Sequence, residues 1–185
     1  VKDLAHLDNL KKDLRENYML FIGSNRSYKG IPLLEQLLKN ESCKFVLIGS
    51  GLSHLNKYPN VKIYENISEK KKADIVSKAS ALLMTSTSRN EAFGIVLVES
   101  LRSGIPILSP DLNSGVSFVN QDNLTGFFYK TGDIIDLRIK LKKFIGLELS
   151  KYLELRFQAR LRYKKIFNLD NMIDSVDEIY DEISQ

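Results

Sequence analysis

Short apolar segments alternate with helical patterns along most of this chain. Six runs of apolar, β-branched or aromatic residues bounded by turn residues predict strands, at 18–23, 44–49, 61–64, 81–85, 105–109 and 126–129. Apolar residues with helical spacing lie between them, at 31–39, at 69–79 after an N-cap serine, and at 94–104. Apolar strands that alternate with helices predict a parallel sheet covered on both faces, the α/β doubly wound Rossmann-like class, with about six strands.

Helical patterns also occur at both ends of the sequence. One covers residues 3–15, and three more close the chain, at 133–145, 150–167 and 170–183. The chain has 185 residues, of which 43% are hydrophobic, and it contains neither internal repeats nor a low-complexity linker. It is long enough to bury a sizeable core, so we predict a single domain over residues 1–185 with extra C-terminal helices.

Composition argues against several classes of protein. No apolar run approaches the ~20 residues that span a bilayer, and the first residues lack the pattern of a signal peptide. Cys43 is the only cysteine, which leaves no intramolecular disulfide framework. The two histidines lie in unrelated segments, so the sequence offers no metal-ligand cluster. We therefore expect a cytoplasmic protein with no metal site and no bound cofactor.

Charge is unevenly distributed near the carboxyl end. Residues 138–165 carry ten Lys and Arg residues against Glu148 and Glu154, whereas residues 166–185 carry six acidic residues and no basic one. A basic helix beside an acidic helix would explain this pattern. A basic face against an anionic membrane, at its inner surface, is the alternative. The basic residues match no nucleic-acid-binding motif, so we do not expect a nucleic-acid partner.

Ligands of doubly wound sheets bind at the carboxyl ends of the strands, so the loops there are candidate sites. The loop GSNRSYKG, at 23–30, contains Arg26 and Lys29 between glycines and leads into a helix. It lacks the order of a P-loop, because Lys29 precedes Gly30. An Arg fork and a Lys point charge suit a diphosphate, although two solvated loop cations would give the same pattern.

The segment NEAFGIVLVES, at 90–100, contains two carboxylates in apolar surroundings. Glu91 precedes the predicted helix, and Glu99 lies little more than one turn after Gly94. The first free N–H groups of a helix bind anions, and glycine lets a phosphate approach the backbone. Glu91 could instead cap the helix, but capping does not explain Glu99. We expect both carboxylates to reach one mouth at the sheet edge.

These residues carry a resemblance to a known family. Glu91-Ala92-Phe93-Gly94 through Glu99 resembles the Glu-x7-Glu signature of retaining glycosyltransferases of the GT-B fold, family four. The segments FIGSNRSYKG, KFVLIGSG, ENISEKKKADIVSKASALLMTSTSRNEAFG and SGIPILSPDLNSGVSFVNQDNLTGFFYKTGD resemble that family's strands and loops in the expected order. The resemblance covers about residues 18–145, which is nearly all of the predicted sheet.

The resemblance implies a role for each candidate side chain. Glu99 would bind the ribose hydroxyls of a sugar nucleotide, and Glu91 the hydroxyls of the donor sugar. Arg26 and Lys29 would neutralise the departing diphosphate, which a metal ion does in other transferases. The sequence contains no Asp-x-Asp, which agrees with a metal-independent reaction. The catalytic residues implied are Arg26, Lys29 and Glu91.

Backbone groups would complete the site that the resemblance implies. N–H groups around Phe93, Gly94 and Ile95 would hold the phosphates, and Ile67 would lie against the base. The sequence departs from the family at one position: the arginine often follows the strand glycine directly, where this chain has Ser24. The assignment of Arg26 is therefore less direct than that of Lys29.

GT-B enzymes consist of two Rossmann-like domains, and the resemblance covers one of them. We therefore expect the carboxyl-terminal, donor-binding half, with residues 3–15 as the end of the interdomain connection and the acceptor-binding domain outside this chain. The implied activity is transfer of a hexosyl group to a glycan or glycolipid acceptor, in bacterial surface polysaccharide synthesis. The segment 114–126 resembles a loop of transferases that build bacterial surface polysaccharides, and this resemblance implies a GDP-linked rather than a UDP-linked donor. Two alternatives stay open: another GT-B enzyme, such as a sugar phosphorylase or epimerase, and a non-enzymatic module that binds lipids or polyanions.

Overall fold

The computed structural model describes residues 18–88, 91, 93–168, 173, 180 and 183. Its elements, in chain order, are β1 (Met19–Ile22), η1 (Ser27–Lys29), α2 (Ile31–Asn40), β2 (Phe45–Ile48), η2 (Ser53–Lys57), β3 (Val61–Tyr64), α3 (Glu69–Lys78), β4 (Ala81–Leu83), α4 (Ile95–Arg102), β5 (Ile107–Pro110), α5 (Gly115–Val119), β6 (Gly126–Tyr129), α6 (Ile134–Ile145), α7 (Leu149–Arg162) and η3 (Tyr163–Phe167). The helix predicted at 3–15 and most of the one predicted at 170–183 lie outside the described residues.

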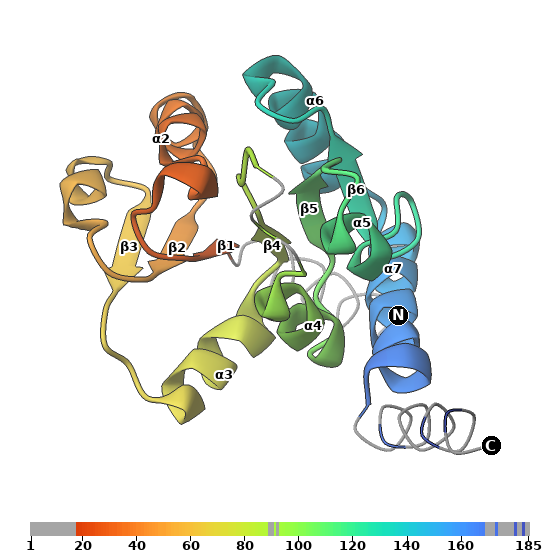
Figure 1. The fold of residues 1–185 in the computed structure, drawn as a ribbon. Coiled ribbons are helices and arrows are strands. Elements are labelled where there is room, and N and C mark those ends of the chain that lie inside the picture. Colours follow the sequence, from red (N-terminus) through yellow and green to blue (C-terminus); the bar gives the residue numbers. More distant parts are fainter. Residues whose placement is uncertain are drawn as a thin grey trace, which may run out of the picture.

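The six strands form one parallel sheet in the order β3-β2-β1-β4-β5-β6 (Figure 1). This is the strand order of doubly wound dinucleotide-binding folds. The order in which strands are added reverses at β1: β2 and β3 lie on one side of it, and β4, β5 and β6 lie on the other. The switch point of the sheet is therefore between β1 and β4, which pair in parallel with Met19 in register with Ala81. The predicted fold class and strand number are confirmed.

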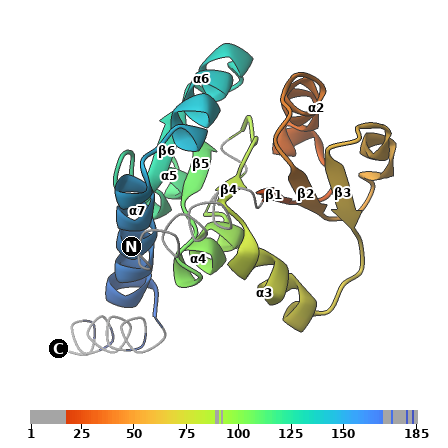
Figure 2. The ribbon, with the colours of Figure 1, turned by 180° about the vertical axis from the view of Figure 1, so that it is seen from behind.

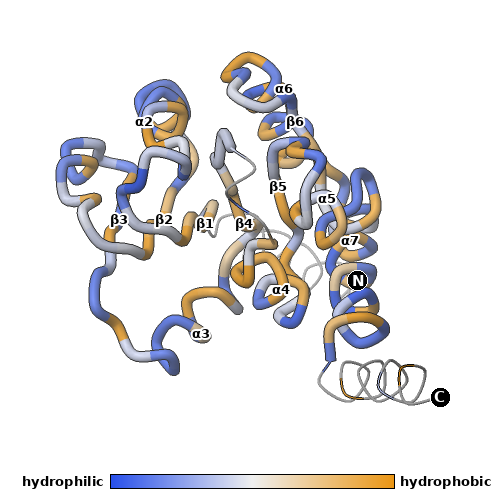
Figure 3. Tube along the Cα trace, viewed as in Figure 1, coloured by the Kyte–Doolittle hydropathy of each residue, from blue (hydrophilic) through white to orange (hydrophobic). Residues whose placement is uncertain are grey.

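Each strand buries side chains on both faces of the sheet, as a parallel sheet between helices requires. In β1, Met19 and Phe21 belong to the core beneath α2 and α6, while Leu20 belongs to the core beneath α3, α4 and α5. Figures 1 and 2 show α2 and α6 on one side of the sheet and α3 and α4 on the other. Hydrophobic residues follow β4, β5 and α4 through the middle of the fold (Figure 3).

The structure differs from the sequence-based prediction at three elements. The short helix α5 was not predicted, and it begins where the Ser114 hydroxyl accepts a hydrogen bond from the Val116 N–H. The strand predicted at 81–85 ends at Leu83, and beyond its end the Thr85 hydroxyl donates to the Lys29 carbonyl. The helix predicted at 150–167 ends as α7 at Arg162, and a π-helical turn, η3, follows it.

The basic residues of 138–165 are distributed over α6, α7 and η3. In the described residues, three of them have partners elsewhere on the domain: Arg138 bonds Glu41 at 2.7 Å, Lys143 bonds Asn123 at 3.0 Å, and Arg162 bonds the Val119 carbonyl at 3.0 Å. Lys151 bonds Glu154, within the same segment, at 2.9 Å. Most of the acidic segment lies outside the described residues, so its predicted pairing with this segment stays a prediction. No helix in the described part of the chain is long and apolar enough to span a membrane.

Candidate functional site

The loops that follow β1 and β4 are hydrogen-bonded to each other at the switch point of the sheet, where the strand order reverses. The Thr85 hydroxyl donates to the Lys29 carbonyl at 2.8 Å, and the Thr87 N–H donates to the Tyr28 carbonyl at 2.9 Å. Gly30, with φ of 65°, lies so close that an added Cβ would be 1.8 Å from the Thr85 carbonyl oxygen. Only glycine satisfies both constraints, so the two loops form one fixed edge at the strand ends.

This edge brings Lys29 and Glu91 together. The Lys29 ammonium lies 2.5 Å from Glu91 Oε2, and the two side chains are only 13% and 10% exposed. The Ser86 hydroxyl donates to the same carboxylate oxygen at 3.0 Å. The buried Glu91 carboxylate is therefore paired with a cation and hydrogen-bonded, as a buried charge requires.

Arg26 lies at the rim of the same loop. It occupies the N-cap position of η1, its side chain is exposed, and it makes no ion pair with any described residue. The structure thus separates the two predicted cations: Lys29 lies in the site, and Arg26 lies in solvent three residues away. A guanidinium at the rim is free to reach a ligand bound at the loop.

Helix α4 presents its amino terminus at the same edge. Its N-cap is Gly94, with φ of 71° and no side-chain cap, and the Glu91 carboxylate bonds Lys29 and Ser86 instead. The alternative in which Glu91 caps the helix is therefore wrong. The N–H groups of Ile95 and Val96 have no acceptor within the helix and carry its partial positive charge, whereas the Leu97 N–H donates to the Gly94 carbonyl at 2.8 Å. Phe93 and Ile95 are 41% and 72% exposed, so this end is open to a ligand.

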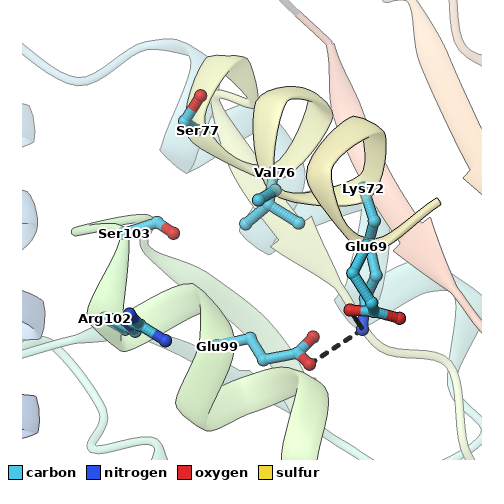
Figure 4. A pocket seen from close by; sticks show the side chains of 8 residues that line it. Glu69, Lys72, Val76, Ser77, Glu99, Arg102 and Ser103 are labelled. Carbon is cyan, nitrogen blue, oxygen red and sulfur yellow. Dashed lines mark hydrogen bonds and ion pairs between the residues drawn. The ribbon is translucent and has the colours of Figure 1, made fainter.

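Glu99 lies in the second turn of α4 and faces α3. Lys72 donates to Glu99 Oε1 at 2.8 Å across a pocket between the two helices (Figure 4). The two carboxylates therefore have different partners: Glu91 pairs with the β1 loop, and Glu99 pairs with α3. Ile67, one residue before the N-cap Ser68 of α3, packs partly buried against the core beneath that helix.

Sequence reasoning missed two side chains that hold the predicted ones. Ser86 lies in a run of small polar residues that gives no signal beyond a loop. Lys72 is one of three consecutive lysines, but it lies four residues before the buried Val76. This spacing places it on the inward face of α3, and helical periodicity could have identified it.

Aromatic residues from three segments meet beside the Glu91 loop. The Phe167 ring, in η3, contacts Phe93 edge-on at 6.0 Å and Phe118 at 5.8 Å between ring centroids. Arg162 lies over the Phe118 and Phe167 rings. The end of α7 and η3 therefore pack against the loop that carries Glu91. This packing was not predicted from the sequence. In the described part of the chain, no three His, Cys, Asp or Glu side chains gather into a group that could hold a metal ion.

The sequence model of the family described as "Glycosyl transferases group 1" matches residues 5–165. The chain belongs to this family. Two bacterial relatives are the O-antigen chain mannosyltransferase C of Escherichia coli, 26% identical over 96% of this chain and 50% of the relative, and the D-rhamnosyltransferase WbpZ of Pseudomonas aeruginosa, 25% identical over 87% and 44%.

Solved structures agree with the fold. Anabaena Alr3699/HepE in complex with UDP-glucose is similar with a TM-score of 0.76 and 17% identity, over 98% of this chain and 53% of that protein. The chain thus spans about half the length of the relatives and neighbours that it matches. The predicted family and the Rossmann-like half of a GT-B fold are confirmed.

Proposed function

We propose that this chain is the donor-binding half of a metal-independent, retaining glycosyltransferase that transfers a hexosyl group from a nucleoside diphosphate sugar. The observation that carries the proposal is the joint placement of Lys29, Glu91 and the open amino terminus of α4 at the switch point of the sheet. A buried ammonium beside free helix N–H groups is suited to a diphosphate, and the carboxylate beside it is suited to sugar hydroxyls.

In the proposed reaction, the bond between the sugar C1 and the diphosphate oxygen breaks, and a bond from C1 to the oxygen of an acceptor hydroxyl forms on the same face. The proton of that hydroxyl passes to the departing diphosphate. Negative charge develops on the departing diphosphate. Lys29, Arg26 and the N–H groups of Phe93, Gly94 and Ile95 would stabilise that charge, so no metal ion is required. Glu91 would orient the sugar, while Glu99 and Ile67 would hold the ribose and the base.

The donor base is proposed as guanine or uracil. Similarity to a mannosyltransferase agrees with the GDP-linked donor that the sequence favours, whereas the structural neighbour HepE was solved with UDP-glucose. The name of one relative, the O-antigen chain mannosyltransferase C, gives a glycan chain as its product, which supports a glycan or lipid-linked acceptor. Because the relatives are about twice as long as this chain, we propose that a second, N-terminal Rossmann-like domain supplies the acceptor site.

We further propose that the protein works at the cytoplasmic face of a membrane, with α6 as the contact. The outer face of α6 exposes Ile135, Ile139 and Ile145, which are 69%, 57% and 46% exposed. Lys142 lies on the same exposed face, and the Lys143 that follows it is exposed too. Exposed isoleucines with lysines on one helix match the pattern of helices that lie on anionic lipid surfaces.

Thermal-shift titration with UDP, GDP, ADP and their sugar conjugates tests the proposal. A ligand at 100 times its Kd stabilises the folded state by about 2.7 kcal/mol, which is visible as a rise in Tm. We expect a rise with at least one nucleoside diphosphate and its sugar conjugate, and none with inorganic phosphate alone. A response to inorganic phosphate with no response to nucleotides would favour a sugar phosphorylase, and no response to any nucleotide would contradict the proposal.

A further inference from the structure

The two oxygens of the Glu99 carboxylate are in different environments. Oε1 accepts a hydrogen bond from Lys72 at 2.8 Å, while Oε2 is buried and has no hydrogen-bond partner in the described part of the chain. The Glu99 side chain is 34% exposed and that of Lys72 is 19% exposed. Figure 4 shows the Lys72 ammonium directed at this carboxylate, so a ligand that reaches Oε1 also meets the ammonium beside it.

Of two neighbouring lysines in α3, Lys71 and Lys72, only Lys72 lies on the side of the helix that faces Glu99. The side chain of Lys71 is 52% exposed and lies 3.9 Å from Asp74, on the outer face of the helix. Lys72 instead lies one turn before the buried Val76 and extends toward α4. Its only other described acid within ion-pair distance is Glu69, at 3.7 Å, whose side chain is 88% exposed. The contact to Glu99 is thus the shorter and more enclosed of the two.

The groove between α3 and α4 has the dimensions of a ligand site. It has a volume of about 380 Å³ and is lined by Lys72, Val76, Glu99, Arg102 and Ser103, among others. That volume falls within the range of small-molecule pockets. Glu99 lies on its wall, whereas Glu91 does not, so the groove is a place for the part of a ligand that Glu99 recognises.

We propose that Lys72 is a positioning residue that holds Glu99 in the orientation from which Oε1 accepts a ribose hydroxyl, and that it thereby sets the preference of the site for ribose over 2′-deoxyribose. The inference rests on the proposed function, since it needs a nucleotide ligand. A carboxylate oxygen has two acceptor sites, of which Lys72 occupies one and leaves the other for a hydroxyl donor. Without the ammonium, the Glu99 side chain can rotate away, and a nucleotide must order it again on binding.

Titration calorimetry on folded variants tests this inference with UDP, GDP and their 2′-deoxy analogues. Lys72→Met should weaken the binding of the preferred ribonucleotide about 10-fold, the factor typical of one hydrogen bond to a charged group, and leave its 2′-deoxy analogue nearly unchanged. Lys72→Arg, which keeps a cationic donor, should retain part of the preference. Lys71→Met is the matched control, because it removes the same charge from the same helix and should change neither affinity.

The following outcomes distinguish failure of this inference from failure of the proposed function. Equal losses for ribonucleotide and deoxyribonucleotide in Lys72→Met would overturn the positioning role, as would tighter ribonucleotide binding, which would make Lys72 a competitor of the ligand. If Glu99→Ala abolishes the preference for ribose while Lys72→Met and Lys72→Gln preserve it, the proposed function stands and the role of Lys72 fails. If the unmodified protein binds no nucleotide, both fail together.

Discussion

The ammonium of Lys29 lies 2.5 Å from the carboxylate of Glu91, although 62 residues separate them in the sequence. The pair connects the loop after β1 to the loop after β4, the two strands that flank the switch point of the sheet. It also explains how Glu91 tolerates burial, because the carboxylate has a cation and a hydroxyl donor within hydrogen-bonding distance. In the proposed complex, the Lys29 ammonium would contact both the Glu91 carboxylate and the diphosphate.

The stability of the domain should depend on this pair. Lys29→Met leaves a buried carboxylate without its cation, and we expect a loss of about 3 kcal/mol in the free energy of unfolding, measured by urea denaturation. The double variant Lys29→Met/Glu91→Gln should recover much of that loss, because no unpaired charge remains.

Lys57→Met is the matched control for this prediction. Lys57 pairs with Glu35 at 2.6 Å, but its side chain is 57% exposed, so its removal should cost less than removal of Lys29. If Lys29→Met lost no more stability than Lys57→Met, or the double variant were less stable than Lys29→Met, the buried pair would not stabilise the site as described.

Much of the sheet could be predicted from the sequence, because its strands are apolar on both faces and therefore form continuous runs. Glycines and N-caps also set the bounds of α3 and α4 closely. The short helix α5 could not be predicted, because its five residues show no helical period of their own. It depends on the N-cap Ser114, which precedes it. The π-helical turn η3 contacts α4 and the rings of Phe93 and Phe118, which lie far from it in the sequence, so adjacent residues do not encode these contacts.

The site was predicted in part for a similar reason. Glu91, Glu99 and Lys29 lie in segments with a recognisable order, so the sequence identified them as candidates. Their partners are different in kind: Ser86 and Lys72 are brought into contact by the tertiary fold, across separate elements. The division between a buried Lys29 and an exposed Arg26 also follows from the path of the loop, because both belong to the same short segment.

Nucleotide binding should not require a divalent cation. The Lys29 ammonium, the Arg26 guanidinium and the amino terminus of α4 are proposed to supply the positive charge that a diphosphate needs. Affinity measured by calorimetry should therefore be the same in excess chelator and in millimolar magnesium or manganese. Loss of binding in chelator, with recovery on addition of either metal, would show that this charge is insufficient.

The outer face of α6 should bind anionic membranes. We expect the domain to co-sediment with phosphatidylglycerol vesicles at low salt and to be released by about 0.5 M salt, which screens exposed charges within about 5 Å. Ile135→Ser/Ile139→Ser should reduce binding, whereas Leu124→Ser, at a site 39% exposed outside α6, should not. Absence of vesicle binding at low salt would contradict the membrane proposal and leave the glycosyltransferase proposal intact.

Cys43 should react slowly with alkylating reagents. Burial, followed by the nearby Glu41 carboxylate, raises the pKa of the Cys43 thiol from 9.0 to about 11. At pH 8 the thiolate fraction is then about 100-fold lower than in the unfolded chain. The unfolded thiol ionises first, so folded-state stability should fall as pH rises above about 9. Labelling of the folded protein at pH 8 as fast as in urea would contradict this pKa.

The central claim is that Glu99 binds the ribose of a sugar nucleotide and Glu91 binds its sugar. Calorimetry of Glu99→Ala and Glu91→Ala with a nucleoside diphosphate and with the corresponding sugar nucleotide tests both assignments, once both variants are shown by circular dichroism to be folded. Glu99→Ala should weaken both ligands about 10- to 100-fold, because a hydrogen bond to a charged group contributes about 1.5–3 kcal/mol. Glu91→Ala should weaken only the sugar nucleotide. Equal weakening of both ligands by Glu91→Ala, or of neither by Glu99→Ala, would contradict the account.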